Sequence, residues 1–169
     1  MIIQCTKKLA DEMKIKVSKP EVLNENQILC WHANLFKIGR KKCVLVMNNL
    51  TRYHFVLYGL VKKDFVKFEE LVKMNIAENF LADGMNPDHI DRYIDRLGEI
   101  QLCATSDRSI ISQMTDSILA IEYMIYYEEE KGNSISIFEI NRKLNYTLMM
   151  KIPKYPYEMM IDALSASGD

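Results

Sequence analysis

Hydrophobic and polar positions in the first third of the chain follow a pattern typical of β-strands. Runs rich in β-branched and aromatic residues are separated by turn residues at Gly39-Arg40 and Asn48-Asn49. Large apolar groups occur at both odd and even positions of these runs, so we expect a sheet covered on both faces, at least in part. The predicted strands are Ile2–Thr6, Gln27–Ile38, Lys42–Met47 and Tyr53–Leu60, and the last three form an antiparallel meander.

The turn at Gly39-Arg40 predicts the register of the first hairpin. A two-residue turn makes the flanking residues face each other in order, and residues two apart then share one face of the sheet. Trp31 and Ala33 are therefore expected on the opposite face from His32 and Asn34. The predicted pairs are Phe36 with Cys43, Asn34 with Leu45, and His32 with Met47.

After residue 60 the apolar spacing changes to three and four, which indicates helices. Asn86 followed by Pro87, and Ser136 followed by Glu139, are typical helix starts. One more strand is predicted at Glu99–Ala104. The helices are predicted at Lys7–Lys16, Asp64–Leu81, Pro87–Leu97, Asp107–Lys131, Ser136–Asn145 and Tyr157–Leu164. Strands before helices favour an α+β fold, with an antiparallel or mixed sheet and four or five packed helices, mostly from the C-terminal half.

Composition agrees with one domain over residues 1–169. The chain is 49% hydrophobic and 27% charged, with 6 Gly and 4 Pro, and it contains no apolar run near 18 residues and no signal-peptide pattern. The four cysteines are never closer than 13 positions, which predicts free thiols. We therefore expect a cytoplasmic protein without a membrane segment.

The net charge of −1 hides two oppositely charged parts. Residues 1–76 carry 14 Lys/Arg and 7 Asp/Glu, a balance of +7, whereas residues 77–169 carry 8 and 16, a balance of −8. Such a division is typical of a basic surface for nucleic acid or anionic lipid, or of two parts that attract each other. The basic part coincides with the meander and the acidic part with the helices, so we expect attraction within one molecule or between two copies.

Several common kinds of chemistry are excluded by spacing. The closest glycines are 14 residues apart, which excludes GxGxxG, Walker A and GxSxG motifs. The histidines at 32, 54 and 89 form neither an HExxH motif nor a local zinc site. We therefore expect neither a metal nor a cofactor.

Two groups of residues remain as candidates. His32 and His54 lie on strands that are neighbours or one strand apart, and each is either an acid–base group or a buried, hydrogen-bonded sheet residue. Arg40 and Arg52 belong to a basic region around the turns, interleaved with aromatic residues such as Trp31. That region could hold phosphate groups, or its lysines could keep a sheet edge unpaired. A pI near 6.3 makes nucleic acid the less favoured partner.

The chain resembles a bacterial family known only as a domain of unknown function. The matching segments are Cys5-Thr6-Lys7-Lys8-Leu9, Trp31-His32-Ala33-Asn34-Leu35, Arg40-Lys41-Lys42-Cys43-Val44-Leu45, the positions Asn49, Thr51 and Tyr53, and Thr105-Ser106-Asp107-Arg108-Ser109 with Met114 and Asp116. Ser112 and Thr115 stand where the family more often has glycine and asparagine. The resemblance implies a small, soluble, cytoplasmic protein, and it implies no activity or cofactor.

The resemblance directs attention to the start of the predicted long helix. Thr105, Arg108 and Ser109 could bind a phosphate or carboxylate there, because free N–H groups and the helix dipole favour an anion. Alternatively Ser106 or Asp107 caps the helix and Arg108 pairs with an acidic side chain.

The sequence favours a non-enzymatic binding or regulatory protein, whose partner is another protein or a second copy of the chain. The alternative is a protein or enzyme for nucleic acid or a phosphate ligand, with His32 or His54 as acid or base and Arg108 as the stabilising cation. The candidate site residues are Trp31, His32, Asn34, Arg40, Arg52, His54, Thr105, Arg108 and Ser109.

Overall fold

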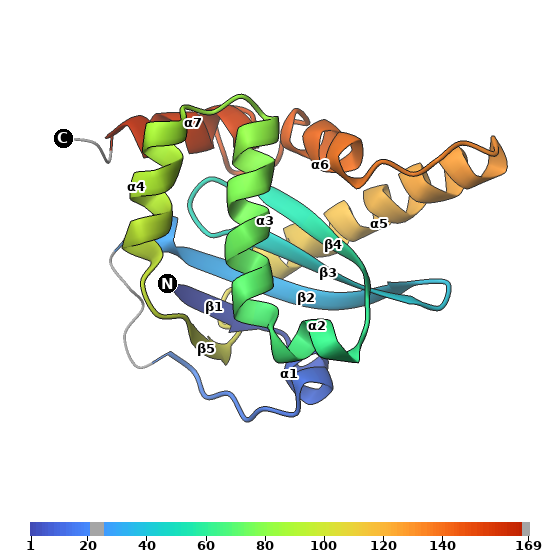
Figure 1. Cartoon of the computed structure of the whole chain (residues 1–169), viewed down its shortest axis with the longest axis horizontal. Coiled ribbons are helices and arrows are strands. Elements are labelled where there is room, and N and C mark those ends of the chain that lie inside the picture. The colour runs from blue at the N-terminus through green and yellow to red at the C-terminus, as the bar shows by residue number, and fades with distance from the viewer. Residues whose placement is uncertain (21–25, 167–169) are drawn as a thin grey trace.

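The computed structural model describes residues 1–20 and 26–166, and it contains one five-stranded sheet with helices on both faces (Figure 1). The strands are β1 Ile2–Cys5, β2 Cys30–Ile38, β3 Lys41–Asn48, β4 His54–Leu60 and β5 Gln101–Ala104. The α-helices are α1 Lys7–Met13, α2 Lys62–Val66, α3 Phe68–Ala82, α4 Pro87–Leu97, α5 Arg108–Glu130, α6 Ile137–Asn145 and α7 Pro156–Ala166, and Gln27–Leu29 form a 3-10 turn. The α+β class is confirmed.

The sheet is mixed, with strand order β4-β3-β2-β1-β5. β2, β3 and β4 form the predicted antiparallel meander, and β1 lies parallel to both β2 and β5. The predicted register is confirmed, since His32 pairs with Met47 and Phe36 pairs with Cys43. The Gly39-Arg40 turn determines this register because Gly39 adopts a φ of 56°, which a two-residue hairpin turn requires.

Each face of the sheet carries its own hydrophobic core. One core contains Trp31, Ala33 and Leu35 of β2 together with residues of α3, α4 and α7, and α3 and α4 lie in front of the sheet in Figure 1. The other contains Leu45, Met47 and neighbouring side chains against α5 and α6. The prediction of a sheet covered on both faces is therefore confirmed.

The helices differ from the predictions mainly in number. The described residues form seven α-helices where six helical segments were predicted, because the helix predicted from Asp64 to Leu81 is divided at Lys67 into α2 and α3. Asp64 is not the cap of a long helix; its carboxylate accepts a hydrogen bond from the N–H of Val61 inside the first turn of α2. The predicted caps Asn86 and Ser136 are confirmed. None of the described helices has the length and apolar character needed to cross a membrane.

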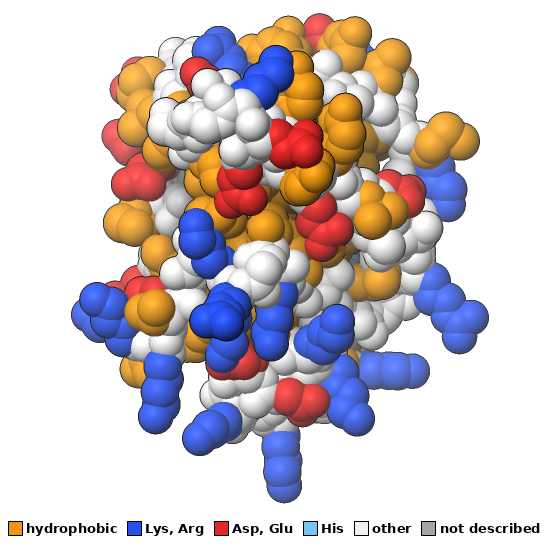
Figure 2. All heavy atoms as spheres, turned by 90° about the vertical axis from the view of Figure 1, so that its right-hand side faces the viewer, with side chains coloured by type: hydrophobic (Ala, Val, Ile, Leu, Met, Phe, Trp, Pro, Cys, Tyr) orange, Lys and Arg blue, Asp and Glu red, His pale blue; other side chains and the backbone are white. Residues whose placement is uncertain are grey.

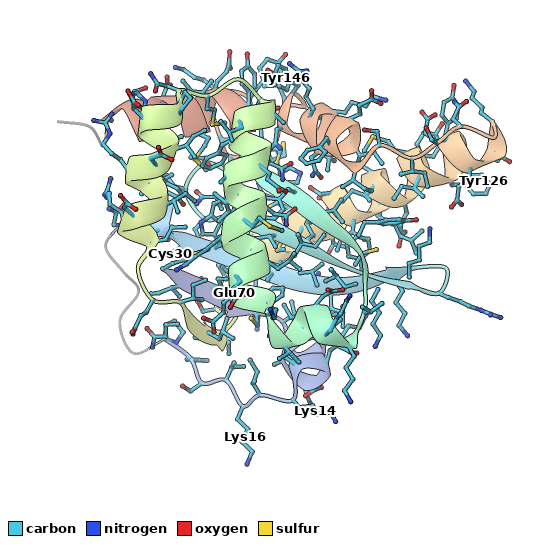
Figure 3. All side chains as sticks on the ribbon, viewed as in Figure 1. Lys14, Lys16, Cys30, Glu70, Tyr126 and Tyr146 are labelled. Atoms are coloured by element: carbon cyan, nitrogen blue, oxygen red, sulfur yellow. The ribbon has the colours of Figure 1, made fainter. Side chains whose placement is uncertain are left out.

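The two oppositely charged parts of the chain are not joined by ion pairs within the described residues. The three ion pairs there are Lys42–Glu12, Arg142–Asp83 and Lys154–Asp162, and each joins two residues of the same part. Figure 2 shows Lys and Arg side chains gathered over the lower half of one face, and acidic and hydrophobic side chains over the upper half. Lys14 and Lys16 project outward below α1 (Figure 3). The two charged parts therefore form separate surfaces and are not joined by ion pairs among the described residues.

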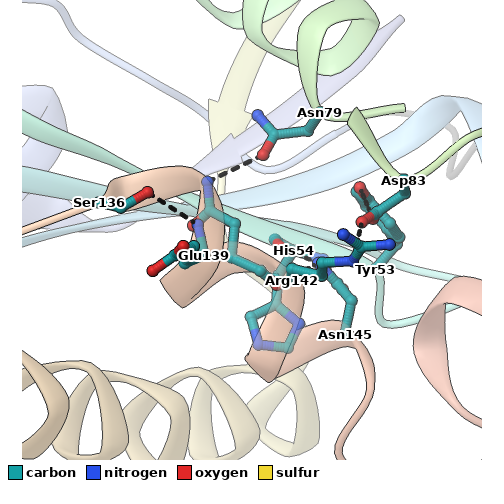
Figure 4. Close-up of polar contacts among 9 residues, drawn as sticks. Tyr53, His54, Asn79, Asp83, Ser136, Glu139, Arg142 and Asn145 are labelled. Atoms are coloured by element: carbon teal, nitrogen blue, oxygen red, sulfur yellow. Dashed lines mark hydrogen bonds and ion pairs between the residues drawn. The ribbon is translucent and has the colours of Figure 1, made fainter. Parts of the chain in front are cut away.

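Helix α6 covers the outer edge of strand β4 through two asparagines. The side chain of Asn145 accepts from the N–H of His54 at 2.9 Å and donates to the His54 carbonyl at 2.7 Å. One helical turn earlier, Asn141 accepts from the N–H of Val56 at 2.9 Å and donates to Asn79 of α3 (Figure 4). Two side chains four apart on a helix thus take the place of a neighbouring strand, and they close an edge that would otherwise be open to pairing.

Candidate functional site

The β-sheet register places polar residues in one row on the face covered by α5. Gln4 of β1 pairs with Cys103 on one side and with His32 on the other; His32 pairs with Met47, and Met47 pairs with His54. Because paired residues share a face, Gln4, His32 and His54 all lie beneath the same helix layer. The sheet thus brings together two histidines that are 22 positions apart in sequence.

His32 belongs to a buried chain of amide hydrogen bonds. Its Nδ1 lies 2.7 Å from Oδ1 of Asn49, and Nδ2 of Asn49 donates to Oε1 of Gln4 at 3.1 Å. Gln4 in turn donates to the hydroxyl of Ser106 at 2.8 Å. Since Oδ1 of Asn49 can only accept, Nδ1 of His32 carries the proton, and Nε2, which has no partner among the described residues, holds a lone pair. Burial lowers the pKa of His32, and the Asn49 hydrogen bond opposes that effect.

Arg52 connects this chain to α5. It lies in the β3–β4 turn with a φ of 61°, its Nε donates to Oε1 of Gln113 at 2.6 Å, and a terminal nitrogen donates to the carbonyl of Asn49. The side-chain Nε2 of Gln113 donates a hydrogen bond to the carbonyl of Met150 at 2.5 Å. Burial lowers the pKa of Arg52, and the charge of Asp107 opposes this. The guanidinium therefore connects the turn, α5 and the segment after α6, and it is directed into the fold rather than toward a surface partner.

His54 has a defined tautomer and a buried lone pair. Its Nδ1 lies 2.7 Å from the carbonyl oxygen of Arg52, and because a carbonyl only accepts, Nδ1 carries the proton. Nε2 is then unprotonated, is buried, and has no hydrogen-bond partner in the described part of the chain. Burial lowers the pKa of His54 to about 4, so the ring is neutral at pH 7. In Figure 4 the ring lies on the side of α5, away from the backbone bonds that Asn145 makes.

His54 lines a pocket of about 330 Å³ between α5, α6 and the segment that follows α6. Apolar side chains, among them Met124 and Leu144, form most of the wall. Polar groups are few: Gln113, Asp116 and Ser117 from α5, and Lys143 and Thr147 from the other side. An apolar cavity of about 300 to 1,000 Å³ with a few converging polar groups is the usual form of a small-molecule site.

Three of the predicted site residues lie away from this pocket. Trp31 is fully buried in the opposite core, where its Nε1 donates to the hydroxyl of Tyr93 at 3.0 Å. Asn34 lines a broad groove between α1, β2 and α5, together with charged residues such as Lys8 and Glu12. Arg40 is exposed in the turn between β2 and β3. The structure therefore does not bring these three together with His54.

The start of α5 is capped by its own side chain. Oδ1 of Asp107 accepts from the N–H groups of Ser109 at 2.8 Å and Ile110 at 3.2 Å. The predicted cap by Asp107 is therefore observed, whereas the predicted pairing of Arg108 with an acidic side chain is not found among the described residues. Arg108 is exposed and forms no ion pair with any described residue. The hydroxyl of Ser109 accepts a hydrogen bond from Lys151. The backbone N–H of Thr105 donates to the Cys5 carbonyl.

Within residues 1–20 and 26–166, no three His, Cys, Asp or Glu side chains gather in a way that could hold a metal ion. Gln113 and Asn145 were not among the site residues predicted from the sequence. A signal for Asn145 exists, since it lies on the same side of α6 as Ile140, Asn141 and Leu144, and an asparagine among buried apolar residues must find partners. Gln113 carries the same signal, since it lies on the buried side of α5 with Ile110 and Met114, but its partners come from two distant segments.

Comparison with known proteins leaves the site without a described counterpart. No curated protein and no solved structure matches the chain. A family model described as Domain of unknown function (DUF6933) matches residues 2–159. That match spans β1 to α7 and so includes every residue of the His54 pocket and of the His32 hydrogen-bond chain. The chain therefore belongs to the DUF6933 family.

Proposed function

We propose that this protein is a non-enzymatic binding protein whose ligand occupies the His54 pocket. The observation that carries the proposal is His54, which lines an apolar cavity and whose Nε2 is a buried acceptor without a partner among the described residues. A buried polar atom without a hydrogen bond costs about 1–3 kcal/mol, and a ligand donor would remove that cost. The ligand class is a small, neutral molecule with an apolar body and an O–H or N–H group.

Binding fits the site better than catalysis does. A general base works best when its pKa lies near the operating pH, and His54, with a pKa of about 4, is a weak base. Ser117 and Asp116 line the same pocket, but neither hydrogen-bonds to Nε2 of His54. Without a nucleophile or a carboxylate joined to the histidine, the pocket can recognise a donor group but is poorly suited to activate one.

Phenol and anisole test the recognition of a donor, because they share a ring and differ in the hydroxyl hydrogen. Phenol should bind with an affinity on the order of millimolar, and anisole at least tenfold more weakly, since only phenol can donate to Nε2 of His54. Ligand-observed NMR titration measures both. In His54→Phe the two compounds should bind equally, and this ratio does not depend on how much of the variant is folded.

A second variant tests the location. Thr147 is exposed at the pocket wall, so Thr147→Trp should block the cavity and weaken phenol binding at least tenfold without disturbing a core. Ser165→Trp on α7 is the matched control, because it adds the same ring at an exposed position elsewhere. Equal binding of phenol and anisole by the wild type, or unchanged binding by Thr147→Trp, would refute the proposal.

We further infer a regulatory role in a reducing compartment such as a bacterial cytoplasm. The pocket joins two helices and the segment after α6, so a ligand would hold these three parts together and could alter how the protein meets a partner. All four cysteines are buried free thiols, which supports a reducing environment.

Nucleic acid is a second candidate partner, favoured by the basic surface in Figure 2. Exposed cations are carried by α1, the end of β2, the β2–β3 turn and α2, and they include Lys7, Lys8, Lys37, Arg40, Lys62 and Lys63. The aromatic residues interleaved with them in sequence do not form a stacking platform, because Trp31, Phe36 and Tyr53 are buried. Binding would therefore rest on phosphate contacts alone, and it would be sensitive to salt and independent of sequence.

Charge reversal tests this surface. Lys62→Glu/Lys63→Glu should weaken binding to a fluorescent 20-base-pair DNA at least fivefold in low salt, as measured by fluorescence anisotropy. Arg92→Glu/Arg96→Glu on α4 changes the net charge by the same amount at another place and should have less effect. If both double variants lose affinity equally, or if the wild type does not bind, this surface is not a nucleic-acid site.

A further inference from the structure

Helix α5 exposes large apolar side chains on the side that faces away from the sheet. Leu119, Tyr123 and Tyr126 are 60%, 69% and 60% exposed. The helix runs along the back of the sheet in Figure 1, and Tyr126 is labelled near its far end in Figure 3. Exposed apolar groups aligned on one helix face are typical of an interaction surface, whereas single scattered ones are common on any protein.

The exposed residues of this face are symmetric about Leu119. The α5 face comprises Arg108, Ser112, Thr115, Leu119, Tyr123, Tyr126 and Glu130, all exposed. Successive members are four, three, four, four, three and four residues apart, so the spacing reads the same from either end. Leu119 is also the middle residue of α5, which spans Arg108–Glu130. Spacings of three and four keep residues on one side of a helix, the side by which helices pack together.

We propose that the α5 face pairs antiparallel with the α5 face of a second copy, about a two-fold axis at Leu119. In that arrangement each residue meets the one equally far from Leu119 on the other helix. Tyr123 then meets Thr115 of the second copy, and Tyr126 meets Ser112. A large side chain thus lies opposite a small one on both sides of the axis, which allows the two helices to approach closely.

Charge supports a second copy as the partner. The symmetry places Glu130 of one α5 against Arg108 of the other, and Arg108 forms no ion pair with the described residues of its own molecule. Antiparallel helices also place the positive end of each dipole beside the negative end of the other. Because an isologous contact requires a self-complementary surface, a face with symmetric spacing and complementary residues at its paired positions favours a copy of itself over an unrelated protein. A single helix pair is smaller than the roughly 800 Å² per partner of a standard interface, so we expect a weak dimer.

Substitutions at the axis and at the two ends test the dimer by sedimentation equilibrium. The wild type should change from monomer to dimer with concentration, and Leu119→Lys, which brings two like charges together, should weaken association at least tenfold. Met74→Lys on α3 is the control, because it adds the same charge at another exposed apolar position. Arg108→Glu and Glu130→Arg should each weaken the dimer, and the double variant, which exchanges the two charges, should restore it.

A crosslinking experiment tests the position of the axis. Leu119→Cys should form an intermolecular disulfide on mild oxidation, because the residue on a two-fold axis meets itself, and the native cysteines are all buried. Tyr126→Cys should not, because it lies seven residues, about 10 Å, from the axis along the helix. A wild type that stays monomeric at all concentrations, a dimer unaffected by Leu119→Lys, or equal crosslinking of both cysteine variants would overturn the proposal.

Discussion

Replacing Asn145 by alanine is expected to lower the free energy of unfolding by about 3 kcal/mol. The Asn145 side chain satisfies both backbone groups of His54 on the outer edge of β4, and both lie in the protein interior. Alanine would leave a buried donor and a buried acceptor without partners, and each such group costs about 1–3 kcal/mol. Urea unfolding followed by circular dichroism measures the change.

Three further variants separate the hydrogen bonds from the packing of α6. Asn145→Asp keeps the acceptor for the His54 N–H but loses the donor to its carbonyl, so it too should be destabilised. Asn141→Ala should lower the unfolding free energy by about 2 kcal/mol, because it removes the partner of the Val56 N–H. Asn133→Ala is the control, since Asn133 is exposed and its side chain donates to the Glu128 side chain at the surface. If Asn145→Ala costs no more than Asn133→Ala, α6 does not close the sheet edge as described.

Acid is expected to destabilise the protein through His54, by about 2 kcal/mol between pH 7 and pH 5. Burial lowers the pKa of His54 to about 4 in the folded state, against 6.5 when it is exposed. Between pH 6.5 and about pH 4, His54 therefore binds a proton in the unfolded chain but not in the folded chain. The stabilisation is complete above pH 6.5 and is lost as the pH falls through that window. Burial lowers the pKa of His32 as well, which acts in the same direction.

Measuring the unfolding free energy as a function of pH separates the contribution of His54 from those of other groups. His54→Gln should show a smaller loss of unfolding free energy between pH 7 and pH 5 than the wild type, whatever its stability at pH 7. Asp83 acts in the opposite direction, because burial raises its pKa and the folded chain then binds the extra proton. The comparison with wild type cancels this contribution. If His54→Gln loses as much unfolding free energy between pH 7 and pH 5 as the wild type does, burial does not lower the pKa of His54 in this way.

Much of the fold could be predicted because it rests on local patterns. The Gly39-Arg40 turn and the alternation around it are sufficient to give the register of β2 and β3, since a slip of one residue would turn Trp31 out of its core. The starts of α4 and α6 follow from Asn86 and Ser136, whose side chains accept bonds from nearby N–H groups. The division between α2 and α3 was not predictable, because the apolar stripe from Phe65 to Phe80 continues through the break.

The candidate site could be predicted only in part. His32 and His54 were identified because they are titratable groups on strands of one sheet, and their shared face follows from the register. Arg52 was expected at a basic surface, yet its left-handed backbone directs the guanidinium to Gln113. No spacing in the sequence indicates that contact, since Gln113 lies 61 positions away.

The sequence by itself determined the α+β class, the meander and the register of its first hairpin, and most helix boundaries. These depend on interactions between residues close in sequence, where side-chain period and capping groups act directly. Only the tertiary structure decided that His54, with its unpaired nitrogen, lines a cavity, that Asn141 and Asn145 close the sheet edge, and which face of α5 stays exposed. Each of these depends on where α5 and α6 dock, and docking is decided by packing between segments that are distant in the chain.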